Sequence, residues 1–325
     1  MTLATIPALL AVLLCAALFV LLFQYLFPRP APWRLAAASL VAGVLATLVL
    51  TVILRRFVAP GLAGLDGLTS VAAALPFAFL RAGLPEEATK ALAALIALLP
   101  FWRRVTPAAA FQAALFAAVG FAIVENQGYA SAFGEFALLI AFGRGFMATL
   151  THTLLAMIFG GFLMCFAARD WRQWHLLIVG YFVAVLCHSL YDAGLIPILI
   201  EYVKTKTVDP ATILGATPVV VGGILLVLIA GLWSLRTAVR RAAADDAIAA
   251  EPGHQIMVRR WRWSANALLV LGALGLAGAI AWTMGVAASE ADTATPDLQQ
   301  GLPGAIALCG GVFAIILSWV LRQKR

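Results

Sequence analysis

The stretch Pro85-Glu86-Glu87-Ala88-Thr89-Lys90 places three ionisable side chains at the head of an apolar run that extends from Ala91 to Phe101. A charged side chain at the centre of a bilayer costs on the order of 2.5–3.5 kcal/mol on insertion scales, so three together need partners. Candidate partners inside later apolar runs are Glu125, Asn126, His152, His188 and Asp192. We therefore expect these polar side chains to meet in one centre within the membrane.

The composition around this stretch is that of a polytopic membrane protein. Of the 325 residues, 63% are hydrophobic and 11% are charged, whereas a soluble domain has about 25% charged residues. The net charge of +7 does not indicate nucleic-acid binding, because the basic residues cluster in short segments between apolar runs. The four cysteines lie in apolar runs without metal-ligand spacing, so we expect reduced packing residues and no disulfide framework. They are Cys15, Cys165, Cys187 and Cys309.

Apolar runs broken at proline, glycine and charged residues predict an all-α transmembrane helical bundle of about ten spans. The predicted helices are 3–27, 35–54, 67–82, 86–101, 107–125, 146–168, 175–200, 211–235, 264–286 and 304–321. Between the fifth and the sixth we expect a loop of some twenty residues that contains an interfacial or re-entrant piece, 136–142. The first run lacks a basic leading region and is longer than a signal-peptide core, so we expect it to be retained. These helices form an N-terminal pair (1–66), a core with the polar residues (67–200) and a C-terminal part (201–325).

Basic segments predict the orientation in what we expect to be a bacterial cytoplasmic membrane. The basic segment 236–262 and the C-terminal tail should be cytoplasmic, and the acidic segment 288–303 should face outward. Counting back through alternating helices places the N-terminus in the cytoplasm as well. Six basic residues then fall on the outer side, against the rule. They are Arg29, Arg34, Arg81, Arg144, Lys204 and Lys206.

Helix lengths also predict a common depth for the polar residues. At 1.5 Å per residue, His188 lies roughly 20 Å and Glu125 roughly 27 Å from the inner surface, and His152 lies roughly 9 Å below the outer surface. Glu86 and Glu87 would begin a helix that runs inward from the outer side. All four helices would thus place their ionisable groups in the outer half of the membrane, an agreement not expected of scattered polar residues.

Each polar group taken alone also has a structural explanation. The acidic pair could start a helix and pair with Lys90, the histidines could be packing residues, and Glu125 with Asn126 could mark a helix end. His188 and Asp192 are four residues apart and share a helix face, so the aspartate could instead fix the imidazole tautomer. The shared depth favours the functional interpretation for the whole set.

Carboxylates and imidazoles in a partly dry pocket suit the activation of water. A glutamate can act as general base while a histidine holds the water or stabilises an oxyanion. The same residue types can bind a divalent metal such as zinc, with an open position for water. The candidate metal ligands are Glu87, Glu125, His152 and His188. Both routes predict peptide-bond hydrolysis within or just above the membrane, and the sequence leaves open which of Glu86 and Glu87 is the base.

At these residues the sequence resembles the PrsW family of intramembrane proteases. The family's patterns EExxK, FxxxEN, a histidine in the next helix and HxxxD stand here at 86–90, 121–126, His152 and 188–192, across roughly residues 67–200. The residues to which we assign candidate catalytic roles are Glu86, Glu87, Lys90, Glu125, Asn126, His152, His188 and Asp192.

The resemblance implies an all-helical membrane core shared with type II CAAX prenyl endopeptidases and bacteriocin-processing enzymes. It also implies that Glu86 or Glu87 activates water, with or without a metal. The implied substrate is a membrane-tethered protein, such as an anti-sigma factor, cleaved near the outer surface. Lys90 stands where CAAX enzymes have the arginine of an EExxxR pattern, which argues against a prenyl-protein substrate.

Two other classes of protein fit parts of the pattern. A proton-coupled transporter could relay protons through the same glutamate, histidine and aspartate side chains. Such carriers often have repeated halves and interrupted helices near the midplane, and the sequence indicates neither. A non-enzymatic membrane scaffold would leave the polar side chains without a role.

Overall fold

The computed structural model describes residues 5–27, 29–57, 67–132, 137–168, 173–205 and 210–247, which form helices joined by short turns and contain no strand. The α-helices are α1 (Thr5–Leu26), α2 (Trp33–Phe57), α3 (Val71–Ala78), α4 (Leu84–Leu98), α5 (Pro107–Ala132), α6 (Ala137–Ala167), α7 (His175–Thr205) and α8 (Pro210–Ala247). The chain divides into two compact units, Met1–Ala238 and Val239–Arg325, and the contacts described below lie within the first. The all-α prediction is confirmed for the described residues.

Six helices in the described part of the chain are long and apolar enough to cross a membrane. They are Ile6–Leu26, Trp33–Ile53, Pro107–Ala132, Ile140–Ala167, His175–Ile198 and Gly215–Ala242. Large apolar side chains such as Leu10, Val52 and Ile229 are more than 60% exposed on these helices, as expected of surfaces in contact with lipid. The predicted helices 264–286 and 304–321 lie outside the described residues, so the predicted number of spans stays a prediction.

Helix α5 is the central helix of the first unit. It contacts α1, α2, α4 and α6, and its side chains are buried along most of its length. At its crossing with α2, a Cβ atom on Gly43 would lie 2.2 Å from the Ala117 carbonyl oxygen, and one on Gly120 would lie 2.1 Å from the Leu40 carbonyl oxygen. Glycine on both helices therefore lets the two backbones touch, as small residues do in membrane helix pairs.

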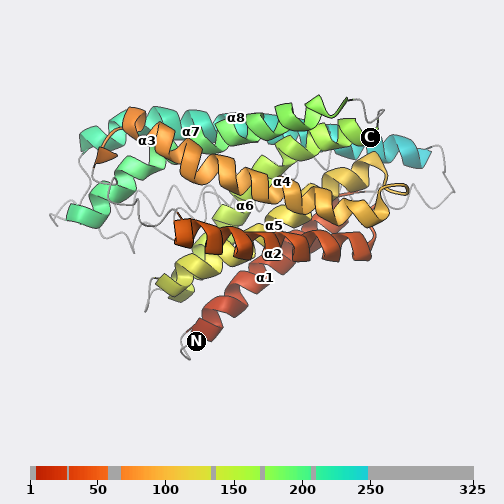
Figure 1. The fold of residues 1–325 in the computed structure, drawn as a ribbon, viewed down its shortest axis with the longest axis horizontal. Helices are drawn as coiled ribbons and strands as arrows, with labels where there is room; N and C mark the ends of the chain where they lie inside the picture. Colours follow the sequence, from red (N-terminus) through yellow and green to blue (C-terminus); the bar gives the residue numbers. More distant parts are fainter. Residues whose placement is uncertain are drawn as a thin grey trace, which may run out of the picture. The chain divides into compact units, whose positions relative to one another are not determined.

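The predicted helices 67–82 and 86–101 form one continuous helical segment. Helix α3 passes directly into a π-helical turn, η2 (Phe79–Gly83), which leads into α4 and a final 3-10 turn, η3 (Leu99–Phe101). In Figure 1 this orange segment runs through α3 and α4 without reversing direction. The predicted break before Pro85 is wrong, because the wider π turn accommodates a residue that lacks a backbone N–H and crowds the preceding turn.

The predicted loop of some twenty residues between α5 and α6 is also wrong. Helix α5 continues seven residues beyond Glu125, and α6 begins at Ala137. The described part of the predicted re-entrant piece, 137–142, is therefore the start of α6. Glu125 and Asn126 lie inside a helix, so they do not mark its end.

Three of the predicted site residues lie near the middle of long helical segments. Glu86 is fifteen residues from each end of the segment 71–101, His152 is fifteen residues from each end of α6, and His188 is thirteen residues from the start of α7. The prediction that Glu86 begins a helix at the outer surface is wrong, because its helix begins at Val71. The fold thus brings the middles of these three segments to one place.

Candidate active site

A buried ion pair on α4 forms one side of the site. Lys90 donates a hydrogen bond to Glu87 Oε1 across one helical turn, and both side chains are only 3% exposed. His188 Nδ1 lies 2.7 Å from the same oxygen, and Lys90 Nζ lies 4.9 Å from the centre of the Phe121 ring. Two donors on one oxygen, one of them cationic, make Glu87 a satisfied, charge-assisted acceptor.

His152 links α6 to the carboxylates of its neighbours. Its Nδ1 atom lies 3.2 Å from Lys90 Nζ, and its Nε2 atom lies 2.6 Å from Glu125 Oε2. A protonated lysine can only donate, so Nδ1 accepts and the ring proton sits on Nε2, where it is donated to Glu125. The ring also packs edge-on against Phe121, with the ring centres 4.9 Å apart. These contacts fix both the tautomer and the orientation of the His152 imidazole.

Arg144 belongs to the site, although its place in the sequence predicts only a charge on the outer side. Its Nη2 atom lies 2.9 Å from Glu125 Oε1, and its guanidinium carbon lies 3.6 Å from the centre of the Tyr129 ring. Once α6 is known to begin at Ala137, the spacing of eight residues places Arg144 about two turns before His152. Glu125 is therefore held between an arginine and a histidine.

His188 has a carboxylate at each ring nitrogen. Nδ1 faces Glu87, whereas Nε2 lies 3.3 Å from Asp192 Oδ2 and 3.7 Å from Glu86 Oε2. Asp192 is four residues further along α7, so the predicted shared face is observed. The negative charge of these two carboxylates can be balanced either by a proton on Nε2 or by a bound cation.

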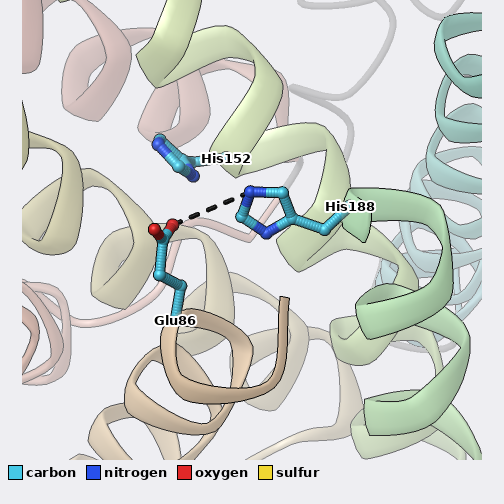
Figure 2. A group of neighbouring side chains, drawn as sticks. All are labelled: Glu86, His152 and His188. Atoms are coloured by element: carbon cyan, nitrogen blue, oxygen red, sulfur yellow. Dashed lines mark ion pairs between the residues drawn. The ribbon is translucent and has the colours of Figure 1, made fainter. Parts of the chain in front are cut away.

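Glu86 carries a buried carboxylate oxygen, Oε2, that has no hydrogen-bond partner among the described residues. Its separation of 3.7 Å from His188 Nε2 is too long for a hydrogen bond. Figure 2 shows the side chains of Glu86, His152 and His188 converging from three different helices, and one ligand atom from each lies within 4.8 Å of the others. Buried polar atoms in native structures normally have a partner, so this oxygen is suited to a water molecule or a cation.

This group of three differs from the metal ligands that the sequence predicts. Glu87 and Glu125 were predicted together with the two histidines, but each is already bound to a histidine and to a cationic side chain. Glu86 takes their place beside the histidines. One carboxylate and two imidazoles are a common zinc ligand set that leaves a position for water, so the donors fit such an ion. Because both nitrogens of His152 have partners, a cation would replace one of those contacts.

Asn126 provides a second unmatched acceptor. Its side chain is fully buried, and Nδ2 donates to Thr149 Oγ1 at 3.2 Å, but Oδ1 has no hydrogen-bond partner within the described ranges. The other seven predicted catalytic residues are joined to one another by side-chain contacts. These seven are Glu86, Glu87, Lys90, Glu125, His152, His188 and Asp192.

Comparison with known protein families gives a match over most of the chain. The family model of the PrsW family intramembrane metalloprotease matches residues 31–233, well over half of the chain. The match extends beyond the motif region 67–200 and takes in α2 and most of α8. No curated protein and no solved structure matches the chain.

Proposed function

Since the chain belongs to the PrsW family of intramembrane metalloproteases, we propose that it hydrolyses a peptide bond of a membrane-tethered protein at the centre formed by Glu86, His152 and His188. The observation that carries this proposal is the buried, unmatched Glu86 oxygen beside two histidines from other helices. The family match favours proteolysis over the proton-coupled transporter.

Glu86 is the carboxylate that we assign to the attacking water. In the route without a metal, its Oε2 atom accepts a proton as the water oxygen attacks the carbonyl carbon, and the proton then passes to the amide nitrogen as the C–N bond breaks. One water is consumed, and a carboxylate and an amine are formed. Glu87 is a poorer candidate, because Lys90 and His188 already occupy its Oε1 atom.

A divalent metal would be held by Glu86, His152 and His188, and when bound it would polarise the substrate carbonyl and make the water more acidic. The chain's own residues orient these donors. Glu87 holds His188 through Nδ1, and Glu125 holds His152 through Nε2. Such outer carboxylates fix the rotation of a ligating imidazole.

The continuous segment 71–101 changes the orientation that we propose. If this segment crosses the membrane once and not twice, the helices before it reverse their direction. More basic residues then lie on the side of segment 236–262, and that side is cytoplasmic. They are Arg29, Arg34, Arg103, Arg104, Arg169, Arg172, Arg236, Arg240 and Arg241. The start of α1 then faces outward, unlike the sequence-based prediction, while segment 236–262 stays cytoplasmic. Glu86, His152 and His188 lie near the middle of their helices, and Glu125 lies seven residues from the outer end of α5. We propose a tethered regulator, such as an anti-sigma factor, as the substrate.

The test compares Glu86→Gln with the unchanged protein in lipid vesicles that also contain single-span reporter proteins. We expect the cleavage rate to fall by about 10²–10⁴-fold, the usual contribution of a general base, while the unfolding temperature is unchanged. Glu201→Gln, at the far end of α7, is the control and should cleave normally. Undiminished cleavage by Glu86→Gln, or no cleavage of any reporter by the unchanged protein, would contradict the proposal.

Metal content separates the two routes to water activation. Mass spectrometry of the purified protein should find a divalent metal that is lost in His188→Ala if the donors hold an ion. Active protein without metal would instead assign the activation of water to Glu86 alone.

A further inference from the structure

The π-helical turn packs closely against α7 at Gly83. A Cβ atom at this position would lie 2.3 Å from Ser189 Oγ and 3.0 Å from the Val185 carbonyl oxygen. A separation of 2.3 Å does not occur for real Cβ atoms, so the Ser189 hydroxyl would have to turn away, and the Val185 carbonyl oxygen would have to shift by a few tenths of an ångström. A larger residue at position 83 would therefore disturb the packing of η2 against α7.

This contact lies one helical turn from the reacting groups. Gly83 precedes Glu86 by three residues, and Ser189 directly follows His188. Between the same two segments lie the 2.7 Å contact from Glu87 to His188 and the 3.7 Å separation of Glu86 and His188. A displacement at Gly83 would thus be transmitted directly to both carboxylates.

The π turn itself determines which way the acidic pair faces. A π turn adds one residue to a turn, and one residue corresponds to a rotation of about 100° in an α-helix. The turn is held from α7 at a second point, because the Tyr181 hydroxyl donates to the carbonyl oxygen of Leu84, the first residue of α4, at 2.9 Å. Helix α7 therefore contacts the segment immediately before Glu86 at both Gly83 and Leu84.

We propose that Gly83 is a positioning residue for the hydrolysis: its contact with Ser189 sets the distance and rotation of Glu86 and Glu87 relative to His188. The proposal rests on the function assigned above to Glu86 and His188. It explains why a π turn, rather than a regular α-helical turn, precedes the acidic pair. π turns inside α-helices are frequent at functional sites.

The experiment compares Gly83→Ala, Ser189→Ala and the double variant in the vesicle cleavage assay. We expect Gly83→Ala to lower kcat with little change in KM, by up to about 10²-fold, the loss that a displacement of about 1 Å can cause in enzymes. Ser189→Ala removes the nearest clashing atom, so the double variant should recover most of the lost kcat. Gly222→Ala is the matched control, because that glycine of α8 has open space around its Cβ position.

Recovery of kcat in the double variant distinguishes a positioning role of Gly83 from a general role in folding. A folded Gly83→Ala protein with unchanged kcat would overturn the inference, and so would a double variant that does not recover. If Gly83→Ala does not fold, Tyr181→Phe decides: a lower kcat at an unchanged unfolding temperature supports positioning, and an unchanged kcat contradicts it. Failure here leaves the proposed function intact as long as Glu86→Gln is inactive.

Discussion

Helix α5 buries one amide side chain toward each end, and the two differ in how their hydrogen bonds are satisfied. Gln112 accepts from the Ala31 N–H at 2.8 Å and donates to the Arg29 carbonyl oxygen at 3.2 Å. Asn126, fourteen residues later, donates to Thr149, but its Oδ1 atom is unmatched among the described residues. Both side chains are fully buried, so exposure to water does not explain the difference.

The surroundings of the two amides show what the difference means. Near Gln112, aromatic rings of α5 pack in pairs with rings of α1 and of the residue that follows it, Phe116 with Phe23 and Phe111 with Phe27. The amide there joins the turn between α1 and α2 to α5, and its bonds are complete. Asn126 directly follows Glu125, which binds His152 of the cluster where the buried Glu86 oxygen also lacks a hydrogen-bond partner. An unmatched buried polar atom in a native interior is suited to water, an ion or a ligand. Because the Glu86 oxygen belongs to the proposed site, we propose that the Gln112 end of α5 serves the fold and the Asn126 end the reaction.

The largest effect on stability is expected from Glu87→Gln. This variant tests whether a carboxylate at the reactive end also stabilises the fold. Removing one partner of a buried ion pair typically costs about 3–5 kcal/mol, because Lys90 would keep an uncompensated buried charge. Denaturant titration of the protein in micelles should measure this loss. Glu86→Gln is the matched control and should show no comparable loss. Equal losses in the two variants would contradict the division of roles between these neighbouring glutamates.

The next effect is expected at the other end of the helix. Gln112→Met keeps the side-chain length but leaves the buried Ala31 N–H without its acceptor, which should cost about 1–3 kcal/mol. The kcat of the folded protein should be unchanged, because Gln112 has no contact with the cluster around Glu86. Denaturant titration and the vesicle cleavage assay measure the two quantities. A lower kcat at unchanged stability would reverse the roles assigned to the two ends of α5.

Much of the reactive end could be predicted from the sequence. Charged and imidazole side chains inside apolar runs need partners, and the motif spacings place them on helix faces that can meet. That logic correctly grouped Glu87 with Lys90 and His188 with Asp192, each within one or two turns of a single helix. Residue pairs on one helix can therefore be predicted from the sequence before any tertiary contact is known.

The free carboxylate could not be predicted in this way. Glu86 and Glu87 differ by about 100° around the helix axis, and the π turn before them sets the absolute rotation. In the sequence, Gly83 and Pro85 indicated a break between two helices, whereas in the structure both lie within one continuous helical segment. Arg144 was missed because its partner Glu125 lies on another helix, and no local spacing predicts such a contact.

The smallest change in stability is expected for Asn126→Leu, which sharpens the comparison most directly. The variant loses the hydrogen bond to Thr149, worth about 1 kcal/mol, but it also removes an unmatched buried oxygen, so the two effects partly cancel. If Oδ1 binds water or substrate in the reaction, kcat/KM should fall about tenfold, which corresponds to one hydrogen bond of about 1.4 kcal/mol. Denaturant titration measures the stability, and cleavage of the reporter measures kcat/KM. Gln112→Met is the comparison, because it should lower stability and leave kcat unchanged. A stable Asn126→Leu protein with unchanged kcat/KM would show that an unmatched acceptor on α5 does not identify the reactive end.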